Sequence, residues 1–148
     1  MIRRAVPGEG EQVRAIVAAA YARYLDRMDK MPAPMLDDYE VRVGEGAVEV
    51  WDDPERGILG MIILGDRADG FMLENVAVSP DAQGMGIGRR LIDHAEAEAR
   101  RRGHRQIRLY THATMVENQR MYARLGYVET ARGEDEGYDR VQFEKHLG

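Results

Sequence analysis

The chain has 148 residues, a formal net charge of −5 and no cysteine. Its length suits one ordinary domain with one core, so we expect a single domain over residues 1–148. The absence of cysteine excludes disulfides, thiolate nucleophiles and cysteine-based zinc sites, and it favours a cytoplasmic location.

The acidic balance argues against a nucleic-acid partner. The longest apolar run, residues 58–64, is far shorter than the roughly 18 residues of a membrane span, so we expect a soluble protein with no membrane partner.

The first half of the chain predicts a strand, two helices and a hairpin. Apolar residues at helical spacing indicate the longer helix, Pro32 and Pro34 prevent its continuation, and a turn at residues 53–57 joins the strands of the hairpin. In chain order, the expected elements are a strand at residues 2–6, helices at 11–24 and near 36–43, and strands at 47–51 and 58–64.

The next segment, FMLENVAVSP at residues 71–80, predicts a strand with an interrupted alternation. It places two polar residues, Glu74 and Asn75, side by side where strict alternation would permit one. We therefore expect a β-bulge at these two residues.

The second half predicts helices at residues 86–102 and 115–125, each followed by a glycine suited to ending it. Thr114 and Glu117 fit a capping box at the start of the second of these helices. Strands are predicted at residues 106–111, 127–131 and 138–145, with an acidic turn at 133–137. The order β-α-α-β-β-β-α-β-α-β-β indicates an α/β fold, an α+β mixed sheet covered by helices.

Residues 81–90 read DAQGMGIGRR and lie where a strand gives way to a helix. The free amides and partial positive charge of a helix start attract anions. Gly84, Gly86 and Gly88 would let a phosphate approach the backbone, and Arg89 and Arg90 would add charge-assisted contacts. The stretch therefore favours a pyrophosphate ligand, with a strained turn and no ligand as the alternative. Its G-x-G-x-G spacing matches neither a Walker loop nor a dinucleotide fingerprint.

Three adjoining segments resemble the GNAT superfamily of acyl-CoA-dependent N-acetyltransferases. Gln83, Gly86 and Gly88 match its signature Q/R-x-x-G-x-G/A, LENVAVSP precedes that signature, and NQRMYARLGY follows it. These motifs cover residues 72–127, and the order of elements extends the resemblance over nearly the whole chain. The resemblance implies the GNAT-type fold, acetyl-CoA as the co-substrate, and acetyl transfer to a primary amine of a small molecule or peptide by direct attack.

The resemblance also implies roles for individual residues. Backbone groups around Val76 and Val78 would pair with the pantetheine arm, and one of these amides would polarise the thioester carbonyl. Tyr122 would protonate the leaving thiolate, with a packing tyrosine as the alternative. Glu74 is the best-placed base, with an ordinary strand carboxylate as the alternative. The residues expected to contact the cofactor are Val76, Ala77, Val78, Gln83, Gly84, Met85, Gly86, Ile87, Gly88, Arg89 and Asn118.

Other polar residues carry weaker indications. The four histidines are too scattered to form a metal set, so no metal is expected. The arginines at 100–102 are interpreted as complementing a helix C-terminus. Residues 21–39 and 134–138 would frame the acceptor, where their acids would favour a cationic amine, with solvated loop charges as the alternative.

Two other classes of function remain as alternatives. A non-catalytic acyl-CoA-binding or sensing domain could use the same phosphate site. A doubly wound nucleotide-binding module is a distant third, because the glycines come too late and at the wrong spacing. The sequence leaves open the acceptor amine, the acyl-chain preference, the choice between Glu74 and a water chain as the base, and the oligomeric state, a homodimer included.

Overall fold

The computed structural model describes all residues from Met1 to Gly148. The chain forms two compact units, one of Met1–Leu64 with Asn75–Ala95 and one of Gly65–Glu74 with Glu96–Gly148. The predicted order of helices and strands is confirmed, and the strands follow the order β1-β2-β3-β4-β5-β7-β6. No helix of the chain is long and apolar enough to span a membrane.

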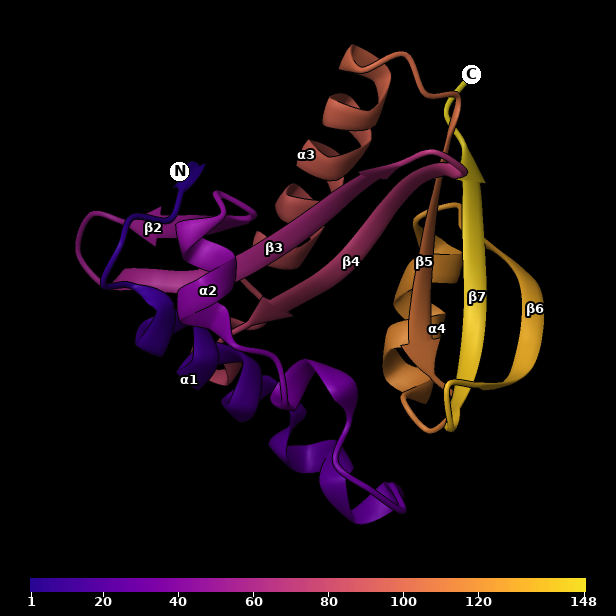
Figure 1. The fold of residues 1–148 in the computed structure, drawn as a ribbon, viewed down its shortest axis with the longest axis horizontal. Helices are drawn as coiled ribbons and strands as arrows, with labels where there is room; N and C mark the ends of the chain where they lie inside the picture. The colour runs from indigo at the N-terminus through magenta and orange to yellow at the C-terminus, as the bar shows by residue number, and fades with distance from the viewer. The chain divides into compact units, whose positions relative to one another are not determined.

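The first unit contains an antiparallel arrangement of three strands with two helices (Figure 1). Strand β2 (Val48–Asp53) pairs with β1 (Ile2–Arg4) on one side and with β3 (Gly57–Arg67) on the other. Helices α1 (Gly10–Tyr21) and α2 (Tyr39–Gly44) lie next to each other. Their apolar side chains form the core with the strands; its members include Val13, Val17, Tyr39, Val43, Val48, Val50, Met61, Ile63 and Ala77.

Strand β3 is buried continuously from Leu59 to Ile63. Met61 and Ile63 belong to the core shared with α1 and α2. A side chain added at Gly60 would come within 3.2 Å of Ile87 and Leu91, which belong to helix α3 (Ile87–Arg101). Helices thus cover both faces of β3, which explains why its sequence is an unbroken apolar run rather than an alternation.

The segment between the first two helices differs from the prediction in its boundaries. Helix α1 ends at Tyr21 and continues as a 3-10 helix, η1 (Ala22–Arg27), and a second 3-10 helix, η2 (Ala33–Met35), contains Pro34. Helix α2 begins at Tyr39, because the Asp38 side chain accepts a hydrogen bond of 3.2 Å from the amide of Val41. This N-cap fixes the start of the helix more strongly than its apolar periodicity does.

Strand β4 (Gly70–Val78) does not show the phase shift that a bulge at Glu74 and Asn75 would cause. Half-buried and buried residues alternate without interruption along the whole strand, and Asn75 occupies one of the buried positions. Its neighbour Glu74 occupies a half-buried position. The two adjacent polar residues therefore reflect a polar residue inside the core, and the bulge itself stays a prediction. Register shifts are found between β2 and β3 at Trp51/Asp52 and between β6 and β7 at Glu129/Ala131.

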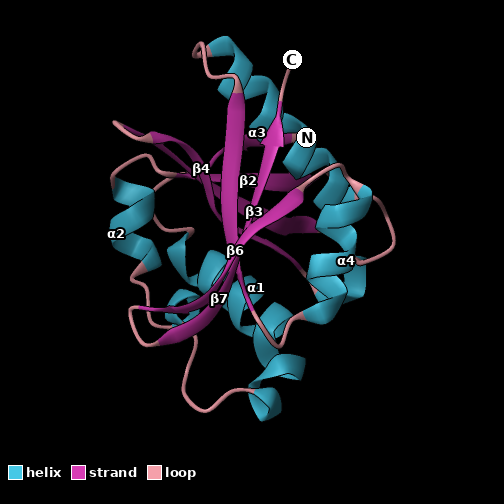
Figure 2. Cartoon of the chain, turned by 90° about the vertical axis from the view of Figure 1, so that its right-hand side faces the viewer, coloured by secondary structure: helices cyan, strands magenta, loops and turns pink.

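The second unit is built on β5 (Gln106–His112), β7 (Tyr138–His146) and β6 (Val128–Asp135), which pair in this order (Figure 1). Figure 2 views this unit from the side of β6. Residues 71–73 of β4 pair in parallel with residues 107–109 of β5. Helix α4 (Val116–Arg124) contacts β7 through the rings of Tyr122 and Phe143, whose centroids are 5.9 Å apart. Strand β6 is longer than predicted, because the hairpin turn needs only Glu136 and Gly137, both with positive φ.

The start of α4 differs from the predicted capping box. Met115 occupies the N-cap position and makes no side-chain cap bond. The Thr114 hydroxyl instead lies 2.8 Å from His112 Nδ1, which also accepts a bond of 3.1 Å from the Thr114 amide. The glycine stops are confirmed, since Gly103 and Gly126 have φ of +85° and +94°.

An ion pair ties the first strand to the start of α1. Glu9 accepts hydrogen bonds from Arg3 at 2.7 and 2.8 Å and from the amide of Val6 at 2.8 Å. The bonds from Arg3 are the main reason why the pKa of Glu9 falls to about 2. Because the folded state holds this carboxylate in its charged form, it is stabilising above the ordinary pKa of about 4.5 and becomes less so as pH falls toward 2.

We expect Glu9→Gln to lower the free energy of unfolding by about 1–2 kcal/mol at pH 7, after allowance for solvent screening. The difference from wild type should shrink as pH is lowered from 5 to 2.5, since the carboxylate then becomes protonated. Urea unfolding at several pH values measures this. Glu55→Gln, in the turn after β2, is the control, and an equal pH dependence in both variants would contradict the assignment.

Candidate functional site

The glycine stretch forms the loop between β4 and α3, as predicted, with a short 3-10 helix η3 (Pro80–Ala82) at its beginning. Gly84 and Gly86 have φ of +91° and +80°, a region that side chains rarely adopt. A Cβ atom built on either residue would meet no atom within 4 Å. The backbone conformation requires these two glycines, and the space beside them is open to a ligand.

The start of α3 presents amides without acceptors. The first bond of the helix joins the Arg90 amide to the Gly86 carbonyl at 3.1 Å. The preceding amides, those of residues 86–89, donate to no group of the protein. A run of free amides at the start of a 15-residue helix is suited to binding an anion.

Two arginines add positive charge at this helix start. Arg89 is exposed and forms no ion pair or hydrogen bond with the protein. The guanidinium carbon of Arg90 lies 5.5 Å from the centroid of the Trp51 ring in β2, at a distance typical of a cation–π contact. Neither charge is cancelled by a paired carboxylate, so both are available to a phosphate.

The other residues predicted to bind the cofactor within the first unit divide by burial. Gln83 and Met85 are exposed, and the Gln83 side chain donates a bond of 3.4 Å to the Val78 carbonyl. Ala77 and Ile87 have buried side chains, so only their backbone groups are available to a ligand. The half-buried residues are Val76, Val78 and Gly88.

A buried hydrogen-bond chain, missed by the sequence analysis, connects β4 to the segment before α2. Asn75 is 9% exposed, and its amide donates to the Tyr39 hydroxyl at 3.0 Å. The Tyr39 hydroxyl donates in turn to the Pro34 carbonyl. Burial raises the pKa of Tyr39, so the phenol stays protonated and able to donate. In the sequence, the only sign of these hydrogen bonds was Asn75, a polar residue in an otherwise apolar strand.

We expect Tyr39→Phe to lower the free energy of unfolding by about 1–3 kcal/mol, because it leaves a buried amide and a carbonyl without their partner. Chemical denaturation of the purified variant measures the loss. Tyr110→Phe on β5 is the matched control, since the Tyr110 hydroxyl makes no hydrogen bond to the protein. Equal stability of the two variants would show that the Tyr39 hydroxyl contributes nothing.

Tyr122 lies on α4 in the second unit and is 4% exposed. Its ring meets the Tyr127 ring edge-on at 5.8 Å, in addition to its contact with Phe143. Asn118, one turn earlier on α4, is half-buried and its amide has no hydrogen-bond partner in the protein. The packing role weighed for Tyr122 is therefore present, and a catalytic role would be additional to it.

A buried ion pair supports the ring that contacts Tyr122. Glu96 is 5% exposed and accepts a bond of 2.9 Å from the Tyr127 hydroxyl. Lys145 donates to both oxygens of this carboxylate, at 3.0 and 3.2 Å. The carboxylate is thus paired and hydrogen-bonded, as a buried charge requires. This network fixes Tyr127 and, through the ring contact, limits the positions open to Tyr122.

Glu74, the predicted base, is paired with Arg67 through Oε1. The bond raises the pKa of Arg67, and only 14% of the Glu74 side chain is exposed. The pair gives Glu74 a structural role on its strand.

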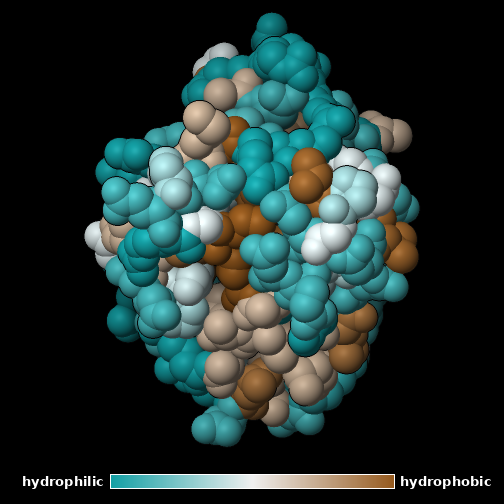
Figure 3. All heavy atoms as spheres, turned by 90° about the vertical axis from the view of Figure 1, so that its left-hand side faces the viewer, coloured by the Kyte–Doolittle hydropathy of each residue, from teal (hydrophilic) through white to brown (hydrophobic).

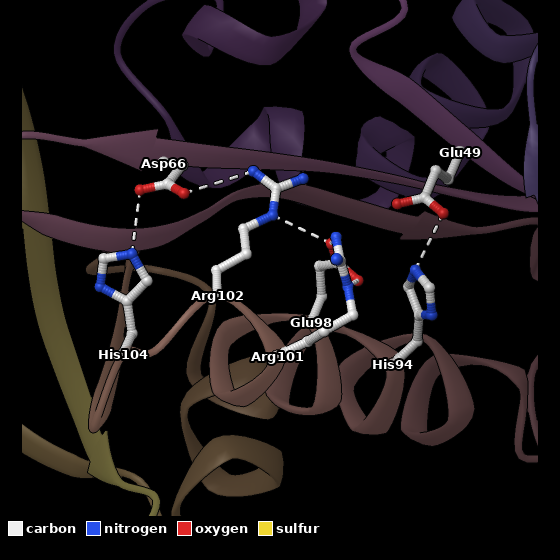
Figure 4. Close-up of polar contacts among 7 residues, drawn as sticks. All are labelled: Glu49, Asp66, His94, Glu98, Arg101, Arg102 and His104. Carbon is white, nitrogen blue, oxygen red and sulfur yellow. Dashed lines mark hydrogen bonds and ion pairs between the residues drawn. The ribbon is translucent and has the colours of Figure 1, made fainter.

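Two arginines at the end of α3 form ion pairs (Figure 4), and the predicted interaction of residues 100–102 with the helix C-terminus stays a prediction. Arg101 and Arg102 both pair with Glu98, and hydrogen bonds led by the one from Arg101 lower the pKa of Glu98 to about 2. Asp66 lies 3.4 Å from Arg102 and 2.9 Å from His104 Nε2. In the first unit, His94 on α3 lies 2.9 Å from Glu49 on β2.

The segments predicted to frame the acceptor contain acids that are partly neutralised. Arg42 pairs with Asp37 at 3.1 Å in the first unit. In the hairpin of the second unit, Arg140 lies 3.1 Å from Asp135 and 3.5 Å from Glu136. Large apolar side chains are also exposed in the first of these segments, at Met31 and Leu36. The charge that these acids offer to a cationic amine is smaller than their number suggests.

Apolar atoms reach the surface at several places on one face of the molecule. Figure 3 shows apolar atoms gathered near the centre of a mostly hydrophilic face. Elsewhere, the structure brings together no group of three or more histidine, aspartate or glutamate side chains that could hold a metal ion.

These features define an α/β protein in which the helix start after the fourth strand is suited to an anion. The sequence model of the acetyltransferase (GNAT) family matches residues 12–127, more than half of the chain. The chain is also 40% identical over 62 residues to N-alpha-acetyltransferase 80 of Mus musculus, a match that covers 42% of this chain and 18% of the mouse protein.

Solved structures share the fold. The PaiA N-acetyltransferase of Thermoplasma acidophilum in complex with coenzyme A has a TM-score of 0.78 at 17% identity, covering 99% of this chain and 98% of that one. YncA of Salmonella typhimurium with its cofactor acetyl-CoA has a TM-score of 0.73 at 22% identity, covering 100% of this chain and 94% of that one. The chain therefore belongs to the acetyltransferase (GNAT) family.

Proposed function

We propose that the chain is an N-acetyltransferase that transfers an acetyl group from acetyl-CoA to a primary amine of a small molecule or peptide. The observation that carries this proposal is the run of free amides at residues 86–89, beside open space at two glycines and the unpaired Arg89. The similarity to a protein named N-alpha-acetyltransferase favours the α-amine of a peptide among the acceptors.

The residues of the first unit bind the cofactor in this proposal. Acetyl-CoA supplies an activated thioester when bound. The amides of residues 86–89 hold its diphosphate, and Arg89 adds a charge-assisted contact. Backbone groups of residues 76–78 hold the pantetheine arm, and one of their amides stabilises the negative charge that develops on the thioester oxygen. Asn118, whose amide has no partner in the protein, is a further contact from the second unit.

Two side chains move protons. Glu74 accepts a proton from the ammonium group, directly or through water, so that the neutral amine can attack. As the new carbon–nitrogen bond forms and the carbon–sulfur bond breaks, the Tyr122 hydroxyl donates its proton to the departing thiolate. The nitrogen loses its second proton as the amide forms, and this proton restores the phenol through solvent, while Glu74 releases its own proton to solvent.

The family match supports treating residues 1–148 as one functional domain, because residues 12–127 span both units. A cytoplasmic location and assembly into a homodimer remain predictions. Sedimentation of the purified chain tests the second of these.

We expect Tyr122→Phe to lower kcat by about 10²- to 10⁴-fold, the range for loss of a general acid, with little change in the KM for acetyl-CoA. The measurement is thiol release with a panel of small amines and of peptides with free α-amines. Tyr110→Phe should retain wild-type turnover. Unchanged turnover in Tyr122→Phe would remove this phenol from the mechanism.

Two substitutions of Gly86 that differ only in charge test whether the diphosphate binds at this helix start. Gly86→Asp and Gly86→Asn place side chains of equal size at the same positive φ, which both residues tolerate better than others do. We expect the aspartate variant to bind coenzyme A about 10-fold more weakly than the asparagine variant, because its carboxylate repels the diphosphate. Calorimetry measures both affinities, and equal values would place the diphosphate elsewhere.

A non-catalytic acyl-CoA-binding domain is the second candidate, favoured by the structural roles of two proposed catalytic residues. Tyr122 packs against aromatic rings, and Glu74 pairs with Arg67. Both residues could persist for stability in a protein that only binds the cofactor. Tight binding of acetyl-CoA without turnover of any amine in the panel would support this candidate.

A further inference from the structure

An arginine from a distant turn reaches the glycine loop. Arg56 lies between β2 and β3, yet its Nη1 donates to Met85 Sδ at 3.1 Å and its Nη2 donates to the Asp81 carbonyl at 3.4 Å. Both partners are uncharged, and a thioether sulfur is a weak acceptor. The guanidinium therefore keeps its full charge beside the loop and has donors to spare for a ligand.

The turn that carries Arg56 is rigid. The Asp53 carboxylate accepts backbone bonds of 2.9 Å from the amides of Glu55 and Arg56, and these bonds lower its pKa. Asp53 thus uses Oδ1 to fix the turn, and it interacts with Arg56 electrostatically without forming an ion pair. Gly57, with φ of +79°, completes the turn. The backbone of Arg56 is therefore held in place before any ligand arrives.

Arg56 contacts the glycine loop at Met85. Met85 stands between the two glycines with positive φ and is half exposed. Arg56 therefore places its charge on the same short loop that carries the free amides and is followed by Arg89 and Arg90. Arg90 in turn lies over Trp51, two residues before the turn of Arg56 begins. Cations from two separate elements of the first unit are thus directed to one loop.

We propose that Arg56 is a further cofactor-binding residue, which supplies a cation from the β2–β3 turn to the phosphates of coenzyme A. This inference rests on the proposed function. Coenzyme A carries a 3′-phosphate in addition to its diphosphate, and this is more negative charge than one helix start and Arg89 neutralise. A guanidinium is suited to such a group because it can donate two parallel bonds to phosphate oxygens.

The test is calorimetric titration of wild type, Arg56→Ala and Arg56→Lys with coenzyme A and with dephospho-coenzyme A. We expect Arg56→Ala to bind coenzyme A about 10-fold more weakly and Arg56→Lys to recover part of the affinity. If Arg56 binds the 3′-phosphate, the loss disappears with dephospho-coenzyme A. If it binds the diphosphate, the loss persists with both ligands. In either case the loss should shrink in 0.5 M NaCl, which a merely structural role would not produce.

Arg14→Ala is the matched control, because Arg14 is an exposed arginine on α1 that pairs with Glu11. Circular dichroism and thermal unfolding confirm that each variant is folded. Wild-type affinity in Arg56→Ala, or a loss that salt does not alter, would overturn the role of Arg56 alone. Failure of the wild type to bind coenzyme A would overturn the proposed function as well.

Discussion

Two glycines in the left-handed region of backbone conformation determine where helix α3 begins. At Gly84 and Gly86 a side chain would face a steric penalty of about 1–2 kcal/mol, and the chain there turns from the end of β4 into the helix. The first amides of an α-helix have no acceptor within the helix, and here no other carbonyl of the protein accepts from them. The suitability of this helix start for an anion thus comes from backbone geometry, to which the arginines add charge.

Several residues expected to act on substrates also hold the structure together. Glu74 pairs with Arg67, and the Tyr122 ring packs against a tyrosine that is fixed by the pair of Glu96 and Lys145. Such residues combine a stabilising role in the fold with a proposed chemical role. A loss of activity on their substitution identifies a chemical role only when stability is measured alongside, because loss of a buried partner alone can cost several kcal/mol.

Sequence patterns predicted the structure correctly where it depends on residues close together in the chain. Gly103 and Gly126 end their helices because each adopts a positive φ, and the apolar run of β3 is buried on both faces as a continuous strand. The same patterns failed where a side chain found another partner. Thr114 fits a capping box, but its hydroxyl meets the nearby His112 ring, so α4 begins without a side-chain cap. At the predicted bulge, Asn75 occupies a buried position, where its amide donates to the Tyr39 hydroxyl.

The sequence by itself determined the order of helices and strands, the glycine loop before α3 and the family, because periodicity, turn residues and motifs are properties of neighbouring positions. Only the tertiary structure decided which groups the polar side chains meet. Asn75 meets Tyr39 at a separation of 36 residues, Arg56 meets Met85 at 29, and Lys145 meets Glu96 at 49. Contacts at such separations depend on how strands and helices pack in three dimensions, and no local pattern encodes them.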